Sequence, residues 1–283
     1  MRTDTDEIYR QKVNQVIDYI SANLHQPLTI DRLADLISVS HRQLIRIMRY
    51  SLNERLFSYI ARQRLEQAVL YMQTEKTSLT KLAERVGYEN PQSFSKAFKK
   101  QFGTPPKAFL NELQKKLENF NKSCSNQQRH PIPEIIEEVD LELVYIRIVG
   151  KYGEEESYDV AWNKLIVFLE NNQALSPENR LIGISFSNPY VTKSEQCRFY
   201  ACASIQKRIL PKGDFGIIRL PKGKYAVYTL KGSYLGLQEL YNNISLNFPY
   251  KLRYGMAFEE YCNNPRNTKK EVDFLTKIFI PIK

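Results

Sequence analysis

Residues 90–102 (NPQSFSKAFKKQF) carry side chains that suit contact with nucleic acid. Glutamine and serine hydrogen-bond to base edges, lysine binds guanine or phosphate, and the segment has no acidic residue. Asn90 is a good helix N-cap and proline suits the first helical position, so the segment predicts a helix with its phenylalanines on one side. The residues on the other side are Gln92, Ser93, Lys96, Lys99 and Lys100. Taken alone, this pattern fits a solvated surface helix equally well.

A second copy of the pattern lies earlier in the chain. Residues 33–53 recur as 82–103, at an offset of 49 and then, after one inserted residue, of 50. Ser40 opens an S-x-x-Q capping box and predicts a helix over 40–52. Each copy is then a short helix, a turn and a basic helix, which is the helix-turn-helix plan. The outward residues of the first basic helix are His41, Arg42, Gln43, Arg46 and Arg49.

Three motifs in this half resemble the DNA-binding domain of the AraC/XylS family of bacterial transcription regulators. They are LTIDRLADLISVS, RQRLEQAVLYM and LAERVGYENPQSFSKAFKKQFGTPPKAFL, and the resemblance runs from about Tyr9 to Leu110. In that family the two basic helices enter successive major grooves on one face of DNA. The resemblance therefore implies double-stranded DNA as a partner, with RNA polymerase as a further candidate. It implies base-edge roles for Arg42, Gln43, Arg46, Gln92, Ser93 and Lys96.

Two positions depart from the family pattern, and a long helix joins the two copies. Asn53 stands where the family usually has glycine, and asparagine also adopts the left-handed conformation. Pro91 occupies a position that is often polar. Residues 55–73 predict a helix about 28 Å long, which would set the basic helices about one DNA turn apart. Arg62 and Arg64 within it are either phosphate contacts or solvated charges, and we favour solvated charges.

The positive charge of the chain is concentrated in this half. The 283 residues carry a formal net charge of +10, and residues 40–110 hold 13 Lys plus Arg against 5 Glu, which is +8. A basic region placed there favours DNA over a membrane as partner. The sequence shows neither an apolar run that could span a bilayer nor a signal-peptide core, so we expect a cytoplasmic protein. The four cysteines lack metal-ligand spacing, so we expect no metal and no cofactor.

Composition divides the chain into two domains. Residues 111–130 begin as a polar helical tail and end in a stretch rich in Ser, Asn, Gln and Pro, which is typical of a linker. We therefore predict an all-α double helix-turn-helix domain over 1–112, a linker over 113–133 and a second domain over 134–283.

The second domain also contains a repeat. Residues 143–150 (LVYIRIVG) are similar to 225–232 (YAVYTLKG), at an offset of 82, and each predicts a strand followed by a helix and two more strands. Two tandem β-α-β-β units predict one antiparallel sheet, with the helices on one side and a cleft where the units meet. The expected fold class is therefore multidomain, an all-α DNA-binding domain followed by an α+β domain.

The second domain resembles the GyrI-like effector-binding domain found in multidrug-sensing regulators. The matching segments are DVAWNKLIVFL, LPKGKYAVYTLKGSY and AFEEYCNN. In that family a carboxylate in an aromatic-lined pocket binds cationic, often planar compounds, and the resemblance places Glu259 in this role. The residues that match or neighbour the aromatic lining are Trp162, Tyr152, Phe186 and Tyr225, and Tyr261 flanks the carboxylate.

The alternation of side chains along a strand limits this predicted ligand site. Neighbouring residues point to opposite faces, so only one of Glu259 and Glu260 can face the cleft. A partly desolvated carboxylate among aromatic rings attracts a cation, and cation–π contacts add about 0.5 to 2 kcal/mol per ring. The alternative is that Glu259 points to solvent.

These features predict a regulator and not an enzyme. The second domain contains no histidine, and the sequence has no P-loop, dinucleotide or metal motif, so we assign no catalytic residue. The predicted function is a sequence-specific DNA-binding transcription regulator whose second domain binds a small, cationic aromatic effector. The alternative is a DNA-binding protein whose second domain hydrolyses or sequesters a small molecule, or binds a protein, without switching DNA affinity.

Overall fold

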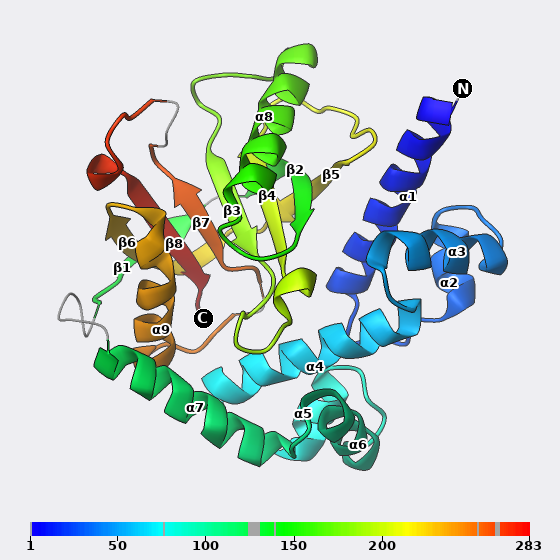
Figure 1. Ribbon diagram of the computed structural model, residues 1–283, viewed down its shortest axis with the longest axis vertical. Coiled ribbons are helices and arrows are strands. Elements are labelled where there is room, and N and C mark those ends of the chain that lie inside the picture. The colour runs from blue at the N-terminus through cyan, green and yellow to red at the C-terminus, as the bar shows by residue number, and fades with distance from the viewer. Residues whose placement is uncertain (1, 76, 124–130, 139, 254, 264–266) are drawn as a thin grey trace. The chain divides into compact units, whose positions relative to one another are not determined.

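The computed structural model describes residues 2–75, 77–123, 131–138, 140–253, 255–263 and 267–283. These residues form two compact units, a helical one and an α+β one (Figure 1). The helical unit holds the chain up to Leu113 together with the short segment 212–216. This architecture confirms the predicted fold class. Residues 124–130 of the predicted linker lie outside the described residues, and the boundaries at 112 and 134 stay predictions.

The first half of the chain is helical throughout its described elements. The helices predicted over 40–52, 55–73 and 90–102 are present with ends within one residue of those expected, and the predicted polar tail is part of α7, which ends at Ser123. The helices are α1 (Arg2–Ala22), α2 (Ile30–Leu36), α3 (His41–Leu52), α4 (Leu56–Thr74), α5 (Leu79–Arg85), α6 (Pro91–Phe102) and α7 (Pro106–Ser123).

The caps of α3 and α6 show why these two short helices begin and end where they do. The Ser40 hydroxyl accepts a hydrogen bond from the Gln43 N–H, and the Asn90 side chain accepts one from the Ser93 N–H. Both helices end on a left-handed residue, Gly103 with φ 80° and Asn53 with φ 53°. The prediction that Asn53 replaces the usual glycine is therefore confirmed.

The two helix-turn-helix copies share α4 as their connection. The apolar face of α3 packs with α1, α2 and the start of α4 around buried residues such as Leu44 and Met48. At its other end α4 packs against α5 and α6, whose buried residues are Phe94 and Phe98. Phe98 also lies 5.5 Å from Phe109 at the start of α7. Each basic helix is thus fixed on its apolar side, which leaves its polar side outward.

The second half of the chain forms one eight-stranded sheet and two helices. The strand order is β1-β6-β8-β7-β3-β4-β2-β5, and the ladders from β1 through to β2 are antiparallel. The strands are β1 (Glu134–Glu138), β2 (Leu141–Val149), β3 (Leu181–Ser185), β4 (Arg198–Ser204), β5 (Phe215–Leu220), β6 (Gly223–Lys231), β7 (Phe258–Tyr261) and β8 (Leu275–Pro281); the helices are α8 (Glu155–Asn171) and α9 (Leu237–Asn247).

Two strands were not predicted, and both lie at an edge of the sheet. Strands β1 and β5 precede the two repeats, so each repeat is β-β-α-β-β rather than β-α-β-β. Strand β7 is short and begins only at Phe258. Before it, Leu252 pairs with Ile282 in an isolated bridge beyond the end of β8.

The two ends of the sheet approach each other at two short connections. Only two residues separate β1 from β2 and β5 from β6, although these strands belong to opposite ends of the strand order. Asp140, between β1 and β2, accepts hydrogen bonds from the Arg219 guanidinium (2.8 Å) and from the Lys222 N–H. The sheet therefore curls, and the face inside the curl encloses a hydrophobic cluster that includes Tyr145 and Phe258.

Both helices cover the other face of the sheet (Figure 1). Leu240 and Ile244 of α9 pack against Tyr228 and Ile278 of the sheet, and α8 packs on β2 and β4. Ile278 pairs directly with Glu259 of β7, so the Glu259 side chain lies on this helix-covered face. The prediction that the helices share one side of an antiparallel sheet is confirmed.

Candidate functional site

The outward face of α6 presents all five residues predicted for DNA contact. Phe94 and Phe98 are fully buried, and this fixes the rotation of the helix about its axis. The exposed residues are Gln92, Ser93, Lys96, Lys99 and Lys100. The face is basic, because two lysines lie in the last turn and the helix contains no acidic residue. It can donate hydrogen bonds to base edges and to phosphates.

The outward face of α3 is exposed like that of α6, except at Gln43. Arg42, Arg46 and Arg49 are exposed, as a DNA-contacting face requires. Gln43 is only half-exposed, and its side-chain amide donates to the Tyr9 hydroxyl of α1 at 2.9 Å. The reciprocal half of the predicted capping box is therefore replaced by a contact to another helix. Part of the hydrogen-bonding capacity of the Gln43 side chain is therefore used within the protein.

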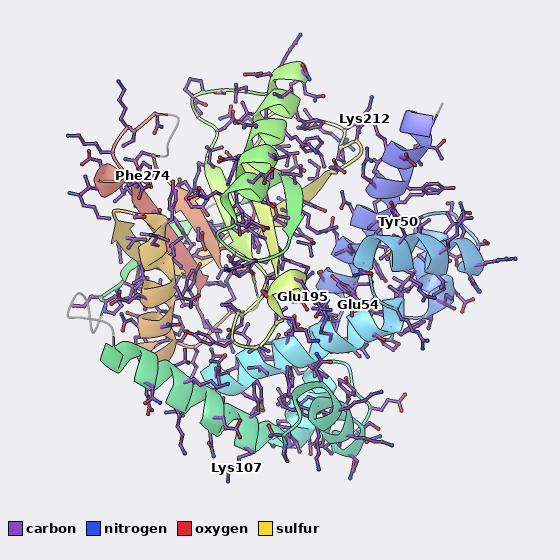
Figure 2. All side chains as sticks on the ribbon, viewed as in Figure 1. Tyr50, Glu54, Lys107, Glu195, Lys212 and Phe274 are labelled. Atoms are coloured by element: carbon purple, nitrogen blue, oxygen red, sulfur yellow. The ribbon has the colours of Figure 1, made fainter. Side chains whose placement is uncertain are left out.

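The two arginines of α4 serve the fold, and our expectation of solvated charges was wrong. The Arg62 side chain is buried and binds Glu54 at 2.5 Å and Glu66 at 3.0 Å. Glu54 lies just before α4 in the connection from α3 (Figure 2). Arg64 donates to the carbonyl oxygens of Leu24 (2.9 Å) and Gln26 (2.8 Å). Hydrogen-bonded burial of this kind stabilises the protein and leaves neither guanidinium for phosphate.

In the α+β unit, Glu259 is buried on the helix-covered face of the sheet. Its side chain lies on β7 and the residue is 3% exposed. The Tyr261 hydroxyl donates to one carboxylate oxygen at 2.6 Å, and the Tyr241 hydroxyl of α9 donates to the other at 2.9 Å. The Ser185 hydroxyl lies 3.4 Å from the carboxylate oxygen that accepts the hydrogen bond from Tyr241. A buried carboxylate therefore sits between the two repeats, held by hydroxyl groups.

The electrostatics of this cluster follow from its burial. Loss of solvent raises the pKa of the Glu259 carboxyl, and the hydrogen bonds from Tyr261, Tyr241 and Ser185 oppose that rise. Burial and the nearby Glu259 charge also raise the pKa of Tyr241 and of Tyr261. The tyrosines therefore remain neutral donors at ordinary pH, and the carboxylate is the group of this cluster whose charge can change.

Aromatic rings surround the carboxylate and are only half-buried. The Trp162 ring of α8 meets the Tyr261 ring edge-on at 5.7 Å between centroids. The Tyr234 ring also packs edge-on against Tyr261, at 5.4 Å, and stacks on Phe274 at 5.1 Å; Figure 2 labels Phe274 just before β8. Tyr158 of α8 feels the Glu259 charge as well, because its pKa is raised by burial and then by that carboxylate. Tyr158, Trp162 and Tyr234 are half-buried, whereas Phe274 is buried.

Not every predicted ligand residue joins this cluster. Tyr152 uses its hydroxyl to hold the chain after β3, accepting from the Ser187 N–H at 2.9 Å with the Arg198 carbonyl oxygen also 2.9 Å away. Tyr225 and Phe186 belong to the hydrophobic cluster inside the curl of the sheet. Tyr225 packs there against Phe258, whose side chain points away from that of Glu259. Of the six predicted residues, Glu259, Trp162 and Tyr261 are brought together, and Tyr152 lies close enough to Tyr241 to contribute to the raised pKa of that tyrosine.

Glu260 shows the alternation expected of a strand. It points to the face opposite Glu259, where the Arg180 guanidinium binds both of its carboxylate oxygens at 2.8 Å. That pairing neutralises Glu260 within the protein. Of the two neighbouring glutamates, Glu259 is therefore the one on the helix-covered face.

Sequence reasoning missed Tyr241, Tyr234, Tyr158 and Ser185. The repeat itself carried a signal for one of them. Tyr234 lies in the G-S-Y segment that repeats G-K-Y.

The structure also limits other kinds of site. Among the described residues, no group of three or more His, Cys, Asp or Glu side chains could hold a metal ion. None of the described helices combines the length and the apolar composition needed to cross a bilayer.

The two units together define a chain that joins a double helix-turn-helix to an α+β unit with a buried acidic cluster. Residues 132–283 match the family model of the GyrI-like small molecule binding domain. That match covers more than half of the chain, and the chain belongs to this family. Residues 33–112 match the model of a helix-turn-helix domain. Both domain types suggested by the sequence motifs are thereby confirmed.

Curated relatives share the first half of the chain. Over 105 residues it is 30% identical to the putative HTH-type transcriptional regulator YkgA of Escherichia coli (strain K12), covering 37% of this chain and 44% of the relative. Over 102 residues it is 31% identical to the Msm operon regulatory protein of Streptococcus mutans, covering 36% of this chain and 37% of that protein. The chain thus spans less than half the length of these relatives.

A solved structure is similar to the same region. The C-terminal domain of AraT, a response regulator from Geobacillus stearothermophilus, is 28% identical in sequence with a TM-score of 0.35. The match covers 36% of this chain and 84% of that chain.

Proposed function

We propose that this chain is a sequence-specific DNA-binding transcription regulator, acting in the cytoplasm, whose second domain binds a small cationic aromatic effector. The observation that carries the proposal is the pairing of two elements in one chain. One is a duplicated helix-turn-helix with two outward basic helices, and the other is a buried carboxylate ringed by half-exposed aromatic side chains. The proposed action is binding and release, with no catalytic step.

Two features support DNA as the partner of the first domain. The basic residues of α3 and α6 are exposed while the opposite sides of both helices are buried. Both helices also belong to copies of one repeat, as expected if they perform the same task on two segments of DNA. The named functions of the relatives agree with this assignment. RNA polymerase is a further partner of the proposed regulator.

A binding-site selection tests the DNA half of the proposal. The full chain is incubated with random duplex DNA, bound sequences are recovered, and affinity for the selected site is measured at several salt concentrations. We expect a motif with two half-sites about one DNA turn apart, and affinity for it well above that for random DNA. Binding that depends only on salt, with no recovered motif, would overturn sequence-specific recognition.

The chemistry of the Glu259 cluster supports a cation as the effector. Both carboxylate oxygens already accept tyrosine hydrogen bonds, so the charge is stabilised without a basic side chain among these partners. A cation brought against the rings of Trp162, Tyr234 and Tyr261 would be attracted by the carboxylate and by the ring faces. Cation–π contacts contribute about 0.5 to 2 kcal/mol each. An aromatic cation would also bury apolar area there.

The single tryptophan provides a direct assay of effector binding. Tetraphenylphosphonium is titrated against the full chain while the fluorescence of Trp162 and the thermal unfolding are recorded, with neutral triphenylphosphine oxide as the comparison ligand. A ligand at 100 times its Kd adds about 2.7 kcal/mol of stability. We expect the cation to bind the parent protein and Glu170→Gln, which changes an exposed carboxylate of α8, but not Glu259→Gln. Equal binding to all three proteins would exclude Glu259 as the effector's partner.

A further inference from the structure

The two repeats of the α+β unit are related residue by residue, and backbone hydrogen bonds give the correspondence. The N–H of Gly150 donates to the carbonyl of Cys197, and in the second repeat the N–H of Gly232 donates to that of Phe274. Just after β3 the Phe186 N–H donates to Arg198, whereas just after β7 the Cys262 N–H donates to Leu275. Phe186 therefore corresponds to Cys262.

Counting back three residues from each of these positions makes Gly183 the counterpart of Glu259. These two residues are also direct partners in the ladder between β3 and β7. A residue that pairs with its own counterpart lies on the pseudo-twofold axis between the repeats. The same position thus carries a carboxylate in one repeat and no side chain in the other.

The space above Gly183 is already occupied. A Cβ built on Gly183 would lie 2.5 Å from the Tyr261 hydroxyl oxygen and 2.6 Å from Cζ of Phe199. Carbon atoms do not approach other atoms so closely, because repulsion rises steeply inside van der Waals contact. Gly183 is not among the glycines with positive φ, so its backbone does not require glycine. Space is the reason for glycine at this position.

We propose that Gly183 is a positioning residue of the effector site, because its missing side chain makes room for the Tyr261 hydroxyl to reach Glu259. The inference rests on the proposed function for the role of the site, and on geometry alone for the role of Gly183. The first repeat supplies the space and the second supplies the charge. A side chain at position 183 would push the Tyr261 ring off the carboxylate and toward the half-exposed rings where the effector would lie.

Removal of the Tyr261 hydrogen bond has a defined electrostatic consequence. That bond favours the charged form of Glu259 and so lowers the pKa of its carboxyl against the rise caused by burial. Without it, Glu259 would take up a proton at a higher pH. A residue with a purely structural role would change stability without moving this titration.

The experiment follows the titration of Glu259 in the full chain without any ligand. Melting temperatures are measured across pH for each protein and for its Glu259→Gln counterpart. The difference between the two melting temperatures changes with pH, and the midpoint of that change reports the pKa of Glu259. Three backgrounds are compared: the parent, Tyr261→Phe and Gly183→Ala. Because Gly183→Ala also meets Phe199, the pair Phe199→Leu and Gly183→Ala/Phe199→Leu removes that second obstacle and keeps the test valid if Gly183→Ala alone does not fold.

We expect the midpoint to move upward in Tyr261→Phe and by a similar amount when Gly183→Ala is added to Phe199→Leu. We also expect Gly183→Ala to move the midpoint little further when it is added to Tyr261→Phe, because both substitutions act through the Tyr261 hydroxyl. An unchanged midpoint in Gly183→Ala/Phe199→Leu relative to Phe199→Leu would overturn the proposal. So would an unchanged midpoint in Tyr261→Phe.

A second arm repeats the tetraphenylphosphonium titration on the same proteins. We expect the affinity to fall at least tenfold in Gly183→Ala/Phe199→Leu relative to Phe199→Leu. Unchanged affinity there would contradict a role of Gly183 in the effector site. If the parent protein binds no cation, the proposed effector class fails, and the titration of Glu259 still decides whether Gly183 positions Tyr261.

Discussion

At the scale of single residues, Glu259 combines a charge with burial, and this combination costs stability. Burial raises the pKa of its carboxyl, so the folded protein binds this proton more tightly than the unfolded chain does. The cost is absent at pH values below the pKa of an unfolded glutamate and is fully present once the pH exceeds the raised folded value. Above that pH the charge of Glu259 weakens the fold.

Glu259→Gln should therefore stabilise the protein at neutral pH, by about 0.5 to 2 kcal/mol, the usual size of one stabilising substitution. The gain should vanish in acid, where the parent carboxyl is also neutral. Thermal unfolding at pH 4 and pH 7.5 measures both values, with Glu170→Gln as the exposed control. A destabilised Glu259→Gln protein at pH 7.5 would show that the tyrosine hydrogen bonds outweigh the cost of burial.

The lysines of α6 differ in what they are expected to read. Lys96 lies in the middle of the outward face, near Gln92 and Ser93 one turn earlier, whereas Lys100 lies in the last turn. Lys96→Ala should lower affinity for the selected site by about 1 to 3 kcal/mol and relax the preference at particular base pairs. Lys100→Ala should weaken all sequences alike and reduce the salt dependence. A selection experiment on both variants compares them, and an unchanged motif for Lys96→Ala would show that this face is not the reading face.

Residue-level prediction succeeded where periodicity decides and failed where packing decides. Alternation along one strand already required Glu259 and Glu260 to face opposite ways, and the structure has them so. The hydrogen bond from Tyr241 joins residues from a helix and a strand, and nothing in local sequence fixes that distance. The resemblance to the GyrI-like domain placed Tyr225 with the aromatic lining near the carboxylate, yet its side chain lies on the other face of the sheet.

At the scale of elements, α4 is the helix of the first unit for which the predicted and the observed roles of the side chains differ most. Its length and apolar positions were predictable from helical periodicity. The roles of its arginines were not, because an arginine on a helix has the same sequence signature whether it meets water or a carbonyl oxygen. The carbonyls of Leu24 and Gln26 come from the end of the α1 region, some forty residues earlier.

Arg64 links the end of α1 to the second helix-turn-helix. Besides binding two carbonyls, the Arg64 guanidinium lies 5.9 Å from the centre of the Tyr88 ring. It also lies beside Gly87, which has φ 85° and no room for a Cβ. Arg64→Lys keeps the charge but loses the planar fork that reaches two carbonyls. We expect a loss of about 1 to 3 kcal/mol in the free energy of unfolding, because two partly buried carbonyls lose a donor.

Chemical denaturation followed by circular dichroism measures this loss, with Arg55→Lys as the control because Arg55 is an exposed arginine at the start of the same helix. Equal stability of the two variants would contradict the structural role of Arg64. We also expect Arg64→Lys to weaken binding to DNA that carries both half-sites more than binding to a single half-site, because the connection between the two basic helices is less rigid.

At the scale of the whole molecule, the sequence defined two domains by their separate repeats, and the fold of each follows from its own periodicity. The strand order of the sheet was less accessible. Strands β1 and β5 are short and are followed after two residues by longer strands, so the sequence pattern does not separate each of them from the next strand. Their places at the two sheet edges depend on contacts such as that of Asp140 with Arg219, far apart in sequence.

A regulator must couple its two domains, and thermodynamics makes that coupling measurable from either side. If tetraphenylphosphonium changes the affinity for the selected DNA by some factor, then that DNA changes the affinity for the cation by the same factor. Couplings of this kind are typically about 5-fold to 150-fold. We expect such a factor in the parent protein, equal in both directions, and no effect of the cation on DNA binding by Glu259→Gln.

Fluorescence anisotropy of labelled DNA, with and without saturating cation, gives one side of this cycle, and Trp162 fluorescence with and without DNA gives the other. Lys96→Ala serves as a control, because it should weaken DNA binding while leaving cation affinity in the absence of DNA unchanged. A cation that binds at Glu259 yet leaves DNA affinity unchanged would refute switching. The second domain would then bind small molecules independently of DNA, because a ligand shifts an equilibrium only by its preference for one state.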